Sequence, residues 1–172
     1  MATTTQRKPL PIADHDPRLT EDAAAVHQAL NELVRVYQFR DRDRICCYDV
    51  SVTQCYALEA VVTEEPLTLN ELAARLYLDK STASRIVDGL EKKGLVERRQ
   101  SPEDRRALQL VATDEGRRLH ARIEADILGQ EKQLLAEFPH EVRQSMAKLM
   151  GQLARAAGTR IDTAGGSCCS IG

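Results

Sequence analysis

The sequence predicts a mainly α-helical fold that is interrupted by one β hairpin. Apolar residues recur at three- and four-residue spacing along most of the chain, which is the period of an α-helix. Two short β-prone runs surround a polar turn that contains Pro102. Aromatic residues make up only 3% of the 172 residues, and tryptophan is absent. The core must therefore be built from Leu, Val, Ile and Ala, which suits packed helices.

The first expected helix follows a proline-containing arm. Residues 1–17 hold Pro9, Pro11 and Pro17, and we expect them to form a mobile N-terminal arm. A long helix is predicted from Thr20 onward, with the charged cluster 40–44 at its end. Its apolar stripe consists of Val26, Leu30, Leu33, Val34 and Tyr37.

The next two helices have recognisable starts. Ser51 or Thr53 is expected to cap a helix that Pro66 closes. Thr68 followed by Glu71 forms a capping box in front of a short helix, Leu69 to Leu76. A further helix begins after a cap at Asp79 or Ser81 and ends at Gly94. Two short helices joined by a tight turn predict a helix-turn-helix.

The second of these two helices has an apolar and a polar face. Ala83, Ile86, Val87 and Leu90 recur at helical spacing and are predicted to face inward. Small hydroxyls would let this helix approach DNA closely, and an arginine can reach guanine edges or phosphate. The alternative is an ordinary solvated helix face. The candidate DNA-contacting residues of the outward face are Lys80, Ser81, Thr82, Ser84 and Arg85.

A basic hairpin follows the helix pair. The runs 95–99 and 107–111 flank a polar turn, and a helix-turn-helix followed by such a hairpin is a winged helix. Residues 80–106 contain eight basic and five acidic side chains, although the whole chain carries a net charge of −2. A local basic face is the minimum requirement for binding phosphates.

These motifs together resemble the MarR family of bacterial transcription regulators. The resemblance covers the segment DKSTASRIVDGLEKKGLV, the pair Asp104 and Arg106 in the hairpin, and Thr113 with Gly116 after it. It spans roughly Val52 to Leu119. It implies a homodimer that binds a pseudo-palindromic operator in double-stranded DNA and acts as a transcriptional regulator of the repressor kind, not as an enzyme.

The resemblance also suggests roles for the wing. Arg105 is expected to enter the minor groove, where a narrow groove concentrates negative potential. Arg106 is expected to touch phosphate, and Asp104 to brace the wing. Arg98 is counted among the DNA-binding residues, and both Arg98 and Arg99 are expected to be solvated or phosphate-facing.

The C-terminal part is predicted to be helical again. Thr113 caps a helix that breaks at Pro139, and a last helix runs to about Ala157. We therefore expect a winged-helix domain at 46–112, a helical dimerisation region at 18–45 and 113–157, and a flexible tail at 158–172. The end helices carry more apolar surface than a small winged helix needs, which favours a dimer. In MarR-like proteins the first and last helices form that interface.

Five cysteines form an unusual set: Cys46, Cys47, Cys55, Cys168 and Cys169. The first three are expected to converge between the first two helices, where a helix N-terminus and nearby arginines favour thiolates. Three thiolates suit a soft ion such as As(III), Sb(III), Hg(II) or Cu(I). The two tail cysteines, or His27, are candidates to complete a four-ligand zinc site.

Other effectors remain open. Thiol oxidation to sulfenic acid is one alternative, although the reactive cysteine of peroxide-sensing relatives lies near the start of the first helix. An aromatic ligand bound between the dimer arms and the winged helix is another, and a chain without a small-molecule signal is a third. We expect no obligatory cofactor. We also weigh a winged helix that binds only proteins, and a metal-trafficking or thiol-redox protein.

Several protein classes are excluded by pattern. No apolar run approaches the roughly 20 residues that span a membrane. The N-terminus lacks the apolar core of a signal peptide, so we expect a cytoplasmic protein. Phosphate loops, zincin motifs and serine-hydrolase motifs are absent from the sequence.

Overall fold

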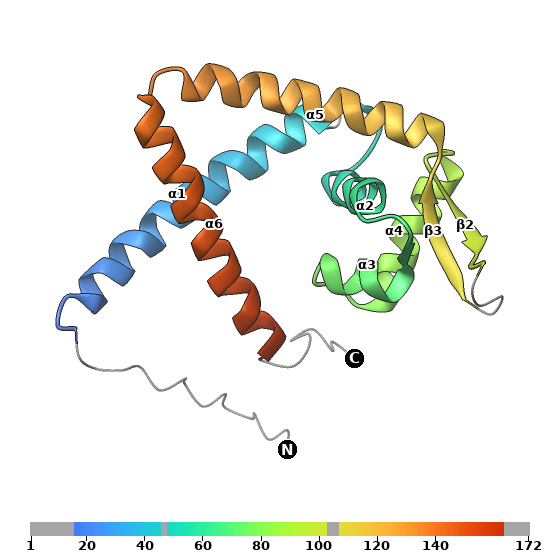
Figure 1. Ribbon diagram of the computed structural model, residues 1–172, viewed down its shortest axis with the longest axis horizontal. Helices are drawn as coiled ribbons and strands as arrows, with labels where there is room; N and C mark the ends of the chain where they lie inside the picture. Colours follow the sequence, from blue (N-terminus) through green and yellow to red (C-terminus); the bar gives the residue numbers. More distant parts are fainter. Residues whose placement is uncertain (1–15, 46–47, 103–106, 164–172) are drawn as a thin grey trace. The chain divides into compact units, whose positions relative to one another are not determined.

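The computed structural model describes residues 16–45, 48–102 and 107–163. It divides into two compact units, with the boundary between Asp41 and Arg42. The prediction of a mainly helical chain with a winged helix-turn-helix is confirmed. Figure 1 shows α2, α3 and α4 gathered beside a small sheet. The elements are α1 (Leu19–Ile45), α2 (Val52–Thr63), β1 (Leu67–Thr68), α3 (Leu69–Arg75), α4 (Lys80–Lys92), β2 (Val96–Gln100), β3 (Leu108–Ala112), α5 (Asp114–Leu135) and α6 (His140–Thr163).

Side-chain caps define the starts of α2, α3 and α5. Ser51 begins α2, and its hydroxyl accepts from the Gln54 amide at 3.1 Å while the Gln54 side chain accepts from the Ser51 amide. The predicted capping box of α3 is present: the Thr68 amide donates to Glu71 Oε2 at 2.8 Å. Thr113 caps α5. Each cap satisfies amides that a helix start leaves without a partner.

The sheet has three strands in the order β1-β3-β2, and both pairings are antiparallel. Leu110 of the central strand lies opposite Leu67 on one side and opposite Arg98 on the other. The third strand, β1, was missed by the sequence analysis because two residues directly before a helix cap carry no strand pattern of their own.

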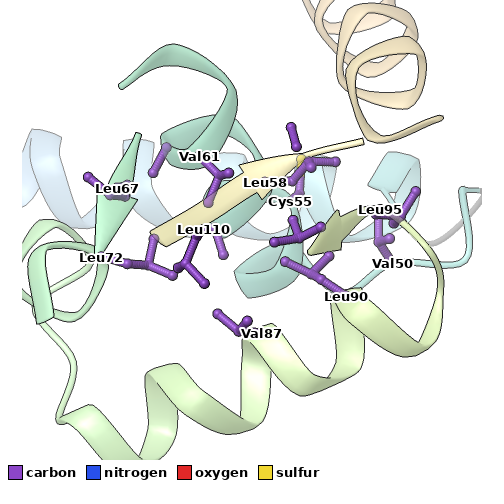
Figure 2. Close-up of a cluster of buried hydrophobic side chains, with 14 of the residues drawn as sticks. Val50, Cys55, Leu58, Val61, Leu67, Leu72, Val87, Leu90, Leu95 and Leu110 are labelled. Carbon is purple, nitrogen blue, oxygen red and sulfur yellow. The ribbon is translucent and has the colours of Figure 1, made fainter. Parts of the chain in front are cut away.

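One apolar cluster unites these elements. Figure 2 shows side chains of α2, α3, α4 and β3 converging in it, among them Leu58, Leu72, Val87, Leu90 and Leu110. All five are buried. Of the four residues predicted to face inward, Ala83, Val87 and Leu90 are fully buried and Ile86 is partly buried, so the inner face of α4 is fixed by the core. Its opposite face is therefore left for another role.

The C-terminal end of α4 is joined to the start of α5. Gly94 has a φ of +68°, and the amides of Gly94 and Leu95 donate back to the carbonyls of Glu91 and Leu90. This is a Schellman motif, which favours glycine at the left-handed position. The Thr113 hydroxyl donates to the Gly94 carbonyl at 2.7 Å and accepts from the Gly116 amide at 3.0 Å. The Thr113 and Gly116 pair thus binds the two helices together.

The long helices α1 and α6 carry apolar side chains that no other described residue covers. In α1, Val34, Val36 and Phe39 are each half exposed or more. In α6, Leu149 is 63% exposed, and Met150 and Leu153 are also exposed. Among the described residues, no helix is both long and apolar enough to cross a lipid bilayer.

Candidate nucleic-acid interface

Asp79 organises the N-terminal turn of α4. One carboxylate oxygen accepts from the Thr82 amide at 2.9 Å and from the Ser81 hydroxyl at 2.5 Å, and the other accepts from the Thr82 hydroxyl at 2.7 Å. The Ser81 hydroxyl, followed by the hydroxyl and amide of Thr82, lowers the pKa of Asp79 far below its ordinary value. Two of the three predicted DNA-contacting hydroxyls, those of Ser81 and Thr82, are therefore oriented before any ligand arrives.

Arg85 is linked to the same network. Its Nη2 donates to the Thr82 hydroxyl oxygen at 3.2 Å, and the side chain is exposed. Because the Thr82 hydroxyl donates its hydrogen bond to Asp79, its oxygen is free to accept a hydrogen bond from Arg85. The chain of contacts from Arg85 to Asp79 holds the guanidinium on the outer face of α4.

The basic side chains around α4 fall into two groups. Lys93 pairs with Asp49 and Arg99 pairs with Glu97. In the described part of the segment 80–106, Lys80, Arg85 and Lys92 form no ion pair and are exposed. Their charge is not compensated locally, so the outer face of α4 is electrostatically suited to an anionic partner.

Arg98 has a different environment from the one expected. Its guanidinium pairs with Asp88 at 2.8 Å and with Glu91, and its backbone amide donates to Glu91 Oε1 at 3.1 Å. The side chain is only 24% exposed. Arg98 is therefore not a solvated residue but a brace between β2 and α4, because two carboxylates of α4 already compensate its charge. Its contact with DNA stays a prediction.

A hollow of about 380 Å³ lies between α3, α4 and the wing. Asn70 and Lys80 line it from the two helices, and Arg98 and Leu108 line it from the strands. The wing and α4 thus form two sides of one concave surface. The predicted wing-tip residues Asp104, Arg105 and Arg106 lie outside the described residues.

Comparison with known proteins identifies this arrangement. Residues 48–107 match the family model described as the MarR family. The winged-helix part of this chain is therefore similar to that of the MarR family.

Known MarR-type proteins resemble the chain over different lengths. The HTH-type transcriptional regulator SarZ of Staphylococcus saprophyticus is 33% identical over 99 residues, which are 58% of this chain and 65% of that protein. The match thus spans less than two thirds of that relative. A MarR family protein from Bacillus stearothermophilus has the same fold, with a TM-score of 0.74 at 22% identity over 80% of this chain and 96% of that chain. A MepR variant from S. aureus, solved bound to an oligodeoxyribonucleotide, gives a TM-score of 0.56 at 18% identity over 77% of this chain and 97% of that chain.

Of the five cysteines, only Cys55 lies within the described residues. Cys55 lies in the apolar cluster beside Leu58 and is 6% exposed (Figure 2). This is the environment of a small core residue, and apolar surroundings disfavour a thiolate. Cys46, Cys47, Cys168 and Cys169 lie outside the described residues, so their convergence with Cys55 stays a prediction. Within the described ranges, no three His, Cys, Asp or Glu side chains are grouped to hold a metal ion.

Proposed function

We propose that this protein is a MarR-type transcription regulator that binds double-stranded DNA through the outer face of α4 and the wing. The observation that carries the proposal is that Arg85 and Lys80 lie exposed and without acidic partners on the helix whose other face is locked into the core. Small hydroxyls beside them permit the close approach that a major groove requires. The MepR variant with a bound oligodeoxyribonucleotide has the same fold, which supports DNA as the partner.

The proposed regulator acts as a homodimer and as a repressor. The exposed apolar side chains of α1 and of α6 are more than a monomer in water normally leaves uncovered. A two-fold dimer would place two copies of α4 roughly 34 Å apart, which is one turn of DNA. A pseudo-palindromic operator follows from that symmetry.

Selection of bound sequences from random DNA, followed by fluorescence anisotropy, tests the proposal. The variant Arg85→Met should weaken operator binding by about 1–3 kcal/mol, because it removes a base or phosphate contact. Lys132→Met removes the same charge near the far end of α5 and should leave the affinity unchanged. A protein that selects no sequence would be a winged helix that binds other proteins instead. Unchanged operator affinity in Arg85→Met would exclude this face of α4 as the DNA-binding surface.

The effector proposed for this regulator is a soft metal or metalloid such as As(III). The support is the adjacent pair Cys46 and Cys47, which directly precedes the loop before α2 in the sequence. Because Cys55 is part of the core, its use as a ligand would require the core around α2 to open. The vicinal pair is therefore the better first ligand, with Cys168 and Cys169 as further donors. By linkage, operator DNA must weaken effector binding by the same factor by which the effector weakens DNA binding.

The effector is tested on the DNA complex of the reduced protein. As(III), Sb(III), Hg(II), Cu(I), Zn(II), hydrogen peroxide and an aromatic acid are added separately. The metal proposal is supported if one soft ion releases the protein from DNA and if the Cys46→Ser, Cys47→Ser variant is no longer released by that ion. Release by peroxide alone identifies an oxidation sensor, and release by the aromatic acid alone identifies an organic ligand.

A further inference from the structure

The loop between α1 and α2 contains a corner that contacts two helices at once. This corner consists of Tyr48 and Asp49. The Tyr48 hydroxyl donates to Asp126 of α5, and the Arg122 guanidinium of the same helix lies 5.4 Å from the centre of the Tyr48 ring. On its other side, Lys93 donates to the Asp49 carbonyl and pairs with the Asp49 carboxylate at 3.2 Å. One two-residue segment thus joins α5 to the C-cap residue of α4.

The backbone of the corner is unusual. Asp49 has a φ of +56°, in the left-handed region that residues with a β-carbon seldom occupy. Aspartate enters this region more readily than most other residues do, and the contacts with Lys93 help to hold Asp49 there. The Asp49 side chain is almost fully exposed, whereas the Lys93 side chain is about one-third exposed. The Lys93 side chain is therefore partly buried where it donates to the Asp49 carbonyl, at the residue with the left-handed conformation.

The position of Lys93 matters because it is the C-cap of α4. The same end of α4 is held on another side by the Thr113 hydroxyl, which binds the Gly94 carbonyl. Two independent attachments thus meet at the end of the helix that lies away from Asp79 and Arg85. Because α4 is one continuous helix packed on the core, a small displacement at this end changes the direction of the helix and shifts the outer face of its first turns.

We propose that Lys93 and Tyr48 are positioning residues, which fix the direction of α4 relative to α5 through the Tyr48–Asp49 corner. The inference rests on the proposed function, because direction matters only if α4 reads DNA. Neither residue touches DNA in this scheme.

A neighbouring lysine provides a matched control. Lys92 and Lys93 carry the same charge at the same end of α4, but only Lys93 contacts the corner. Lys93→Met and Lys92→Met therefore remove equal charge, and any difference between them reports the contact. Lys93→Arg keeps a cationic donor and should restore the behaviour of the natural chain.

The first measurement is operator affinity, together with discrimination between two operators. One has the selected half-site spacing and the other is longer by one base pair. Lys93→Met should bind the selected operator about fivefold to tenfold more weakly than Lys92→Met does, which lies within the range seen for mutations that change coupling without touching either ligand. It should also discriminate less between the two spacings, and its melting temperature shows that it remains folded. Tyr48→Phe should act in the same direction, and the two changes should be less than additive because they act through one corner.

The second measurement does not depend on DNA. Amide hydrogen exchange at Gly94 and Leu95 should be faster in Lys93→Met than in Lys92→Met. Equal exchange and equal operator discrimination in the two folded variants would overturn the inference. If the natural chain selects no operator, the proposed function fails, and the exchange comparison still decides whether Lys93 holds the end of α4.

Discussion

The carbonyl oxygen of Leu95 lies 2.1 Å from the point where a β-carbon on Gly116 would be. Real β-carbons do not approach a backbone oxygen so closely, so the start of α5 can approach the end of α4 only because residue 116 is glycine. The Thr113 hydroxyl bonds to Gly94 at the same junction. The Thr113 and Gly116 pattern noted in the sequence therefore has a steric origin.

Gly116→Ala should destabilise the fold by about 2–3 kcal/mol, because the opposing atom is backbone and cannot rotate away. Gly129 lies in the same helix with no atom within 4 Å of its virtual β-carbon. Gly129→Ala should therefore stabilise the protein by about 0.5–1 kcal/mol through helix propensity. Urea unfolding of both variants measures the contrast. Equal effects of the two changes would contradict the steric argument.

Arg98→Met tests whether Arg98 braces the wing or binds phosphate. The change leaves Asp88 and Glu91 without their common partner, and we expect the free energy of unfolding to fall by about 1 kcal/mol. The salt dependence of operator binding should stay the same, whereas Arg85→Met should reduce its slope by about 1. A reduced slope in Arg98→Met would identify the phosphate contact that the sequence alone suggested.

Asp79→Asn tests the network at the start of α4. In the folded protein the pKa of Asp79 is lowered by the Ser81 and Thr82 hydroxyls, so its carboxylate form stabilises the fold. That contribution is complete at neutral pH and begins to be lost as the pH falls below about 4, where the unfolded chain takes up the proton. Asparagine still caps a helix but does not titrate in this range. Stability measured from pH 6 to pH 3 should therefore fall less steeply in Asp79→Asn, and parallel curves would exclude a role for Asp79.

Local signals in the sequence predicted most of the helix-turn-helix formed by α3 and α4. Thr68 with Glu71, the cap at Asp79 and the glycine at position 94 mark helix ends through short-range chemistry, and each is present in the structure. The outward position of Arg85 follows from helical periodicity in the same way. Such features depend on residues within one turn of each other, so a single sequence contains them.

Contacts between distant residues were not predictable in this way. The ion pairs of Arg98 with Asp88 and Glu91 depend on how β2 packs on α4, and Lys93 meets Asp49 across 44 positions of sequence. The sequence shows those charges but not which of them are compensated. For this reason Arg98 was grouped with exposed basic residues, and the Tyr48–Asp49 corner was not anticipated.

The exposed apolar face of α6 leads to a prediction about assembly. Leu149 and Leu153 are one helical turn apart and are 63% and 41% exposed. If α6 contributes to a homodimer, Leu149→Asp with Leu153→Asp places two charges in an apolar contact, where unpaired charge is strongly unfavourable. Light scattering should then report a monomer, and operator affinity should fall because two half-sites are no longer bound together. Lys148→Asp, which changes charge at an exposed polar position of the same helix, should remain dimeric. A double variant that stays dimeric would exclude this face of α6 from the interface.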